Sequence, residues 1–165
     1  MSFIVRSFLP QDQSAVQRLI LGIQQRELGL ALSENNQPDL KDIADYFGDK
    51  KSAFWVALDG DVLIGCVGLQ DIGDNIAVMR KFMVEKNWRG ERCGVASALL
   101  EVFENYAQSN SMHLIVLSTV YPTFAAQKFY QKRGYSRVER ELMPKSYVPG
   151  LLDEVYFLKH LQKDV

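Results

Sequence analysis

The sequence predicts a mixed α/β fold in which a mostly antiparallel central sheet carries helices on its faces. Short β-rich runs alternate with amphipathic stretches, the dipeptide Asp59-Gly60 joins two such runs as a hairpin turn does, and a further β-rich run follows at 76–84. The expected order of elements is β-α-α-β-β-β-α-β-α-β-β. A chain of 165 residues has the usual size of one domain, so we expect a single domain over 1–165.

The first half of the chain supplies a strand, two helices and the hairpin. Residues 3–8 form the first expected strand, and 12–28 space their apolar residues as one helical face does. A second helix is expected to begin near Pro38, because proline is favoured in a first helical turn. Residues 53–69 contain the two strands of the hairpin.

The second half alternates strands and helices before two closing strands. Gly134 is expected to end the last helix, since glycine readily adopts the left-handed conformation found there. The expected elements are a strand at 76–84, a helix at 93–108, a strand at 113–119, a helix at 123–134 and strands at 135–143 and 152–161, with a loop at 144–150.

Composition excludes several classes of protein. Apolar residues make up 47% and charged residues 24% of the chain, which argues against disorder, and the net charge of −1 does not indicate binding to nucleic acid or a membrane surface. Two cysteines and two histidines lie too far apart in sequence to predict a metal site. We find no apolar run of membrane-spanning length and no signal peptide, and we expect a cytoplasmic protein.

One stretch, "NWRGERCGVASALL" at 87–100, places two arginines and two glycines directly before an apolar helix. Free backbone N–H groups and the positive end of a helix dipole favour an anion there, especially a phosphate. Glycines permit close approach of the backbone, and arginines add charge-assisted hydrogen bonds. The alternative is an ordinary strand-to-helix turn with solvated arginines. Neither a Walker loop nor a G-x-G-x-x-G fingerprint is present.

Two motifs in this half of the chain resemble those of a known superfamily. The segment 79–107 resembles the acetyl-CoA signature of the GNAT N-acetyltransferases, R/Q-x-x-G-x-G/A after a strand, with Arg89, Arg92 and Gly94 in its first, fourth and sixth places. The second signature, A-x-x-F-Y-x-x-x-G-F/Y, is matched by Ala126, Phe129, Tyr130, Gly134 and Tyr135.

The resemblance implies acetyl-CoA as cosubstrate, no metal, and a set of binding residues. Tyr130 takes the place of the group that protonates or hydrogen-bonds the leaving thiolate, and a backbone N–H of Met83 or Val84 would stabilise the oxyanion. Thr123 stands where the family often has Asn and would donate one hydrogen bond to the cosubstrate. The implied contacts to the pantetheine arm come from Phe82, Met83 and Val84, and those to the pyrophosphate from Arg89, Gly90, Glu91, Arg92, Cys93, Gly94 and Val95.

The chain departs from the family pattern at two functional places. Arg92 replaces the usual Gly, and we expect a right-handed backbone there, because a left-handed one costs a side-chain-bearing residue about 1–2 kcal/mol. Val78 stands where many relatives carry a glutamate base, so we expect a water-relayed proton path or an acceptor amine of modest pKa. We interpret Cys93 as a small apolar residue in the first turn of the helix and not as a nucleophile.

The expected reaction is direct attack of a primary amine on acetyl-CoA in a ternary complex, with a small molecule or amino acid as acceptor. The alternatives are a protein lysine or N-terminal acetyltransferase, and a non-catalytic acyl-CoA-binding sensor. Segments 23–40 and 142–154 would form the acceptor wall, and strand alternation would send Arg80 and Lys81 to opposite faces. Dimers are common in the resembled family, so a homodimer is a further expectation. The polar residues expected in the acceptor wall are Gln24, Glu27, Tyr147 and Asp153.

Overall fold

The computed structural model describes residues 2–121 and 123–162, and within them one mixed sheet has the strand order β1-β2-β3-β4-β5-β7-β6. Every neighbouring pair is antiparallel except β4 and β5, which run parallel. This confirms the predicted fold class, and the strands and main helices follow one another along the chain in the predicted order. The strands are β1 (Ile4–Ser7), β2 (Ala53–Asp59), β3 (Val62–Asp71), β4 (Ile76–Val84), β5 (Leu114–Thr119), β6 (Ser136–Val138) and β7 (Val155–His160).

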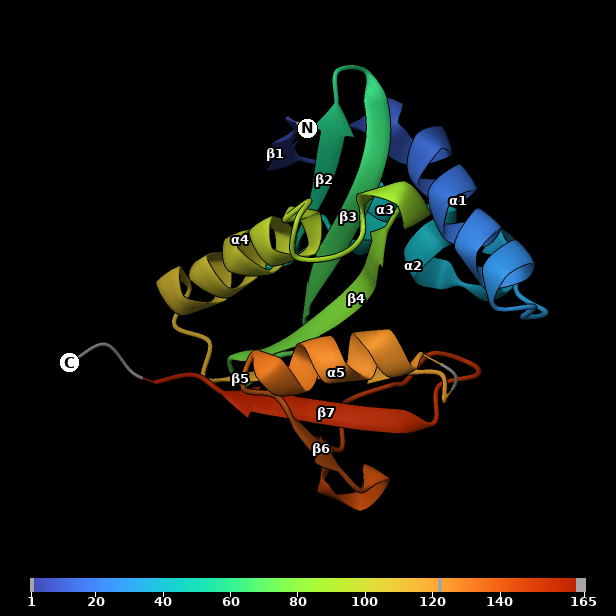
Figure 1. Cartoon of the computed structure of the whole chain (residues 1–165). Coiled ribbons are helices and arrows are strands. Elements are labelled where there is room, and N and C mark those ends of the chain that lie inside the picture. Colours follow the sequence, from blue (N-terminus) through green and yellow to red (C-terminus); the bar gives the residue numbers. More distant parts are fainter. Residues whose placement is uncertain (1, 122, 163–165) are drawn as a thin grey trace.

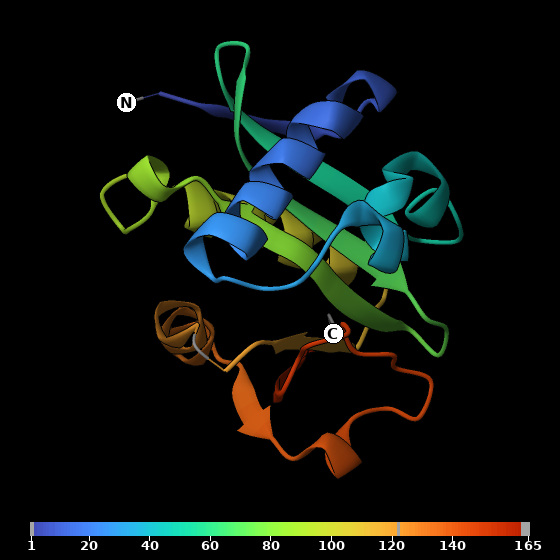
Figure 2. The same ribbon diagram turned by 90° about the vertical axis from the view of Figure 1, so that its right-hand side faces the viewer.

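Helices cover both faces of the sheet (Figures 1 and 2). Alternating residues of β2 show why: Phe54 and Val56 pack with α1 to α3, whereas Trp55 and Ala57 pack with α4. Within residues 2–121 and 123–162, no helix is both long and apolar enough to cross a membrane. The helices are α1 (Gln13–Leu21), α2 (Pro38–Lys41), α3 (Ile43–Tyr46), α4 (Val95–Ser109) and α5 (Phe124–Lys132).

Two elements are clearly shorter than predicted. The helix expected from Pro38 is broken at Asp42, whose backbone is extended and whose carboxylate accepts the N–H of Asp45 to cap α3. The strand expected over 135–143 is only three residues long and leads into the 3-10 turn Arg140–Leu142. In contrast, α1 continues as a π-helical turn over Gly22–Glu27, close to the predicted end at 28.

Candidate active site

The sheet opens into a fork between β4 and β5 (Figure 1). Only Ile76–Val78 of β4 pair with β5, at Leu114–Val116, although both strands continue beyond these residues. Past the point of separation, the edge of β4 that faces β5 has no partner strand among the described residues. An unpaired strand edge offers N–H and C=O groups to an extended ligand.

A β-bulge in β4 accompanies the fork. The register between β3 and β4 shifts by one residue, because Cys66 pairs with Met83 whereas Gly68 pairs with Arg80. Lys81 lies in the extra length of β4 and has φ = 54°, a left-handed conformation that costs a residue with a side chain about 1–2 kcal/mol. A bulge bends and twists its strand, so β4 turns away from β5 where the extra residue is inserted.

The turn before α4 leaves the amino end of that helix uncapped. Gly94 is the N-cap with φ = 73°, and no side chain accepts a hydrogen bond from the first turn. The N–H groups of Val95, Ala96 and Ser97 have no acceptor among the described residues, as expected at a helix start. Three free amides at the positive end of a fifteen-residue helix are chemically suited to a phosphate or another anion.

The residues of this turn have different surroundings. Gly90 has φ = 97°, so both glycines of the motif adopt conformations that favour glycine. Arg92 has no positive φ, so it avoids the cost of the left-handed conformation, but it does not begin the helix, which starts at Val95. Cys93 lies before Val95 and is therefore not in the first turn of α4 as predicted, because the left-handed Gly94 delays the helix start by two residues.

The two arginines of the turn play different structural parts. The Arg89 Nε donates to the Val84 carbonyl at 2.8 Å, and its Nη2 forms an ion pair with Glu27 at 2.8 Å. Arg89 thus ties the π-helical turn that extends α1 to the end of β4, and the carboxylate of Glu27 is already engaged in an ion pair. Arg92 is exposed and forms no ion pair with a described residue, so its guanidinium is free for an anion at the start of α4.

Tyr130 lies on α5 among aromatic rings beside the fork. Its ring packs against those of Phe82, Phe129, Tyr135 and Phe157, with centroids 5.7–6.2 Å apart. Its hydroxyl forms no hydrogen bond with a described residue. Burial, and secondarily the negative charge of Asp153, raise the pKa of Tyr130 above its ordinary value. The phenol therefore stays protonated and can donate a hydrogen bond.

Thr123 has less to offer a ligand than the sequence suggests. It is the N-cap of α5, and its hydroxyl donates to the Val120 carbonyl at 2.7 Å while lying 2.9 Å from the Thr119 hydroxyl. A hydroxyl has one proton to donate. The donation to a cosubstrate that we expected from Thr123 would require this internal bond to break.

A polar cluster occupies the other face of the sheet beside the fork. Tyr147 donates to the Ser118 hydroxyl, and Ser118 donates to Asp153 at 2.7 Å; the direction follows because the single proton of Ser118 goes to the carboxylate. Gly150 N–H also donates to Asp153, at 3.0 Å. Burial raises the pKa of Tyr147 to about 12, so its phenol is protonated as well.

Val78 lies beneath this polar cluster in an apolar environment. It is fully buried with Val116, Met143, Tyr147 and Tyr156. A carboxylate at this position would be desolvated, so the absence of the family's glutamate agrees with its surroundings. Val78 therefore supplies no proton acceptor, and Asp153 is the carboxylate whose charge acts on Tyr130.

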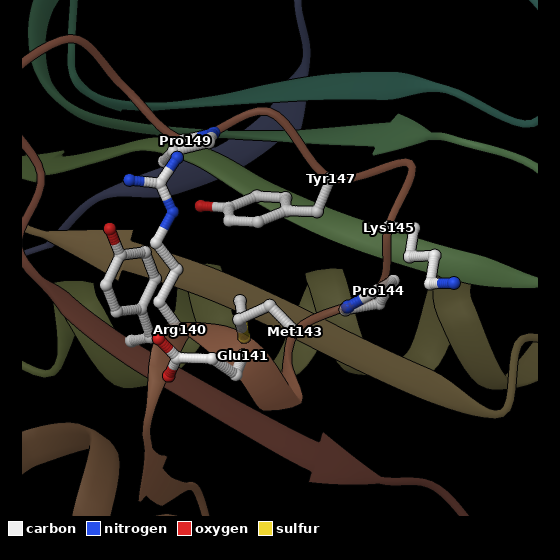
Figure 3. Close-up of a pocket in the computed structure, with 8 residues that line it drawn as sticks. Arg140, Glu141, Met143, Pro144, Lys145, Tyr147 and Pro149 are labelled. Atoms are coloured by element: carbon white, nitrogen blue, oxygen red, sulfur yellow. The ribbon is translucent and has the colours of Figure 1, made fainter.

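A shallow pocket of about 390 Å³ lies beneath the loop between β6 and β7 (Figure 3). Arg140, Met143, Lys145 and Tyr147 are among its lining residues. Tyr147 is the one residue that it shares with the polar cluster, and neither Tyr130 nor the turn before α4 lines it. The pocket therefore contains Tyr147 of the predicted acceptor wall but none of the residues predicted to bind acetyl-CoA.

Sequence reasoning anticipated Tyr147 and Asp153 as wall residues but missed Ser118, which connects them. Ser118 is a small polar residue within a buried-type strand, and no motif marks it. Its partners lie 29 and 35 residues away along the chain. The signal available was strand alternation: Val116 faces the cluster of Tyr147, so Ser118, two residues on, faces the same way.

Comparison with known proteins agrees with this geometry. The model of the acetyltransferase (GNAT) family matches residues 20–135. A probable N-acetyltransferase 14 of Xenopus tropicalis is 36% identical over 66% of the chain and 52% of its own length, and an N-acetylaspartate synthetase of the same organism is 32% identical over 72% and 45%, respectively. The chain thus spans about half the length of these curated relatives.

The fold is also that of solved acetyltransferase structures. A GNAT-family acetyltransferase from Staphylococcus aureus Mu50 superposes with a TM-score of 0.92 at 22% identity, covering 98% of this chain and 100% of that one. This likeness concerns the fold, whereas the family model matches the sequence of more than half of the chain, including both signatures. The chain therefore belongs to the acetyltransferase (GNAT) family.

Proposed function

We propose that the protein transfers the acetyl group of acetyl-CoA to a primary amine of a small molecule or amino acid, by direct attack in a ternary complex. The observation that carries this proposal is the uncapped start of α4 beside the open edge of β4. The start of α4 suits the pyrophosphate of acetyl-CoA, and the open edge of β4 suits its amide-containing pantetheine arm. The two features lie next to each other at the fork.

The proposed contacts of acetyl-CoA are those that the family signature implies. Backbone groups of Phe82, Met83 and Val84 line the open edge of β4, although the Val84 carbonyl already accepts a bond from Arg89. The amides that begin α4 and the free guanidinium of Arg92 receive the pyrophosphate. Acetyl-CoA supplies an activated acyl group on sulfur.

In the proposed reaction, the amine nitrogen bonds to the acyl carbon and the carbon–sulfur bond breaks. A backbone N–H near Met83 or Val84 stabilises the oxyanion. Tyr130 donates a hydrogen bond to the departing sulfur, and its raised pKa makes hydrogen bonding more favourable than early proton transfer. The amine must be neutral to attack, so one proton has to leave it.

We infer that Asp153 is the final acceptor of that proton. Tyr147 and Ser118 form a chain of donated hydrogen bonds that ends on its carboxylate. This replaces the glutamate that many relatives carry at the place of Val78. Asp153→Asn should lower turnover and abolish the base-type limb of the pH–rate profile; an unchanged limb would favour the water-relayed path or an acceptor of modest pKa.

The direct test is calorimetric titration with acetyl-CoA and CoA, followed by thiol release against pooled amines. Binding together with release supports the enzyme. Binding without release from any small amine favours a protein acceptor or a sensor, and an absence of binding contradicts the proposal.

Two tyrosines give matched variants for the catalytic role. Tyr130→Phe removes a hydroxyl without a described partner, so it should leave stability unchanged while lowering turnover more than acetyl-CoA affinity. Tyr135→Phe removes a buried hydroxyl that donates to Glu104 at 3.2 Å, so it should lower stability and leave turnover nearly unchanged. Equal effects of the two variants on turnover would contradict the role of Tyr130.

A further inference from the structure

The bulge in β4 directs two consecutive cations to the same face of the sheet. Regular alternation would put Arg80 and Lys81 on opposite faces, as the sequence predicts. In the structure, Lys81 is the left-handed residue, and its ammonium reaches Asp39 at 3.3 Å on α2. Arg80 points to the same side, where its guanidinium lies 5.4 Å from the ring centroid of Tyr147. The predicted opposite orientation of the two is therefore wrong.

Arg80 is fixed in place by neutral groups. Its Nε donates to the Gln70 side-chain oxygen at 3.1 Å, and its Nη2 donates to the Val148 carbonyl at 2.6 Å. The Tyr46 hydroxyl also interacts with this guanidinium, so at most two of its five N–H donors remain. Arg80 is half-buried and forms no ion pair with a described residue. A half-buried, oriented guanidinium without a counter-charge suits a carboxylate, which it can bind in a bidentate manner.

The neighbouring acidic groups are already engaged. Asp39 pairs with Lys81, whose ammonium also donates to Gln37. Asp153 accepts from Ser118 and from the Gly150 N–H. Neither carboxylate forms an ion pair with Arg80, and both partners of Asp153 are neutral, so Arg80 and Asp153 each lack a counter-charge among the described residues. The arrangement offers a cation for a carboxylate and, across Tyr147, an anion for an ammonium group.

We propose that Arg80 binds a carboxylate of the acceptor, so that the acceptor is a carboxylate-bearing primary amine such as a free amino acid. This inference rests on the proposed acetyl transfer and names the acceptor class for the same site. The acceptor carboxylate meets the free N–H groups of Arg80 while its amine faces Ser118 and Asp153 beside the fork. Lys81, already paired with Asp39, adds little net charge and holds the bulge.

The test compares each acid with its own amide. Wild-type protein is assayed by thiol release from acetyl-CoA with the twenty standard L-amino acids, with the α-carboxamide of each accepted one, and with ethylamine and spermidine. We expect at least one amino acid to be acetylated, with kcat/KM about tenfold or more above that of its amide. Amidation lowers the pKa of the amine, so a larger fraction of the amide is neutral and able to attack. A preference for the acid would therefore appear in spite of this advantage of the amide.

Variants locate the carboxylate. Arg80→Gln should lower kcat/KM for the acid about 10- to 100-fold, mainly through KM, and change that for the amide less than about threefold. Arg80→Lys keeps the charge but not the forked donors and should fall between. The control is Arg140→Gln, which removes an exposed arginine from the neighbouring pocket and should leave both values unchanged. Should Arg80→Gln not fold, the acid–amide comparison in wild-type protein still decides.

The outcomes separate this inference from the proposed function. Acetyl-CoA binding with equal or better transfer to amides, ethylamine or spermidine overturns the role of Arg80 and leaves acetyl transfer standing. Equal losses for acid and amide in Arg80→Gln, or a selective loss in Arg140→Gln, also overturn it. Absence of acetyl-CoA binding overturns the proposed function and the inference with it.

Discussion

Replacing Gly94 by alanine tests the left-handed cap that orients the start of α4. An added methyl group there meets nothing within 4 Å, so steric overlap contributes no cost. The cost comes from the backbone, since φ = 73° is unfavourable for alanine by about 1–2 kcal/mol. At about 2–4 °C per kcal/mol for a chain of this size, the melting temperature should fall by roughly 2–8 °C. Urea unfolding should report the same loss with an unchanged m-value.

Gly22 provides the matched control. It also has nothing within 4 Å of an added methyl, but its φ of −59° is right-handed. Gly22→Ala should therefore raise the unfolding free energy by about 0.5–1 kcal/mol, because alanine loses less backbone freedom in a helix than glycine does. If Gly94→Ala proved as stable as wild type while Gly22→Ala behaved as expected, the reasoning about the cap would be refuted. Acetyl-CoA affinity should fall only in Gly94→Ala.

Three further predictions concern charge, cysteine reactivity and packing. The hydrogen-bonded ion pair with Arg6 holds the pKa of Asp12 below its ordinary value. The stabilisation is therefore present above the unfolded pKa of about 3.9 and is lost as the pH falls through the folded pKa. In Asp12→Asn, the unfolding free energy from urea titrations should fall less steeply over this acidic range. Cys66 is fully buried and its pKa is raised to about 12, whereas Cys93 is half-buried. Iodoacetamide at pH 8 should therefore label Cys93 alone in the native protein. Acetyl-CoA should slow this labelling if the turn before α4 binds it. Gly68→Ala would place a methyl 2.6–2.7 Å from two phenylalanine side chains and should cost about 1–3 kcal/mol by thermal unfolding, more than any gain from reduced backbone freedom.

The elements were predictable where the signal is local. The Asp59-Gly60 turn and the glycine stop at Gly134, with φ = 89°, depend only on neighbouring residues, and both are present. The break at Asp42 was not predicted, since it arises from a capping bond that competes with a continuous helix. The place of β7 between β5 and β6 depends on tertiary pairing that no local pattern encodes.

The site was predictable as a motif but not as a set of contacts. Spacing identified the turn before α4, yet it could not distinguish Arg89, bound to Glu27 and Val84, from Arg92, which is free. In the sequence, each of these two arginines lies one or two residues before a glycine of the same motif. What separates them is a contact 62 residues away, which depends on how α1 crosses the sheet.

The bulge at Lys81 explains why alternation fails where the proposed chemistry lies. One extra residue reverses the facing of all that follows in a strand, so a period of two holds only until the bulge. The same insertion bends β4 away from β5 and brings a second cation to the side of Arg80. The strain of the left-handed Lys81 is opposed by its pairing with Asp39 and by the Cys66 thiol that donates to its carbonyl. The bulge thus opens the fork and brings the two cations of the proposed site together. A prediction based on regular alternation along β4 could not have placed Arg80 and Lys81 on the same face.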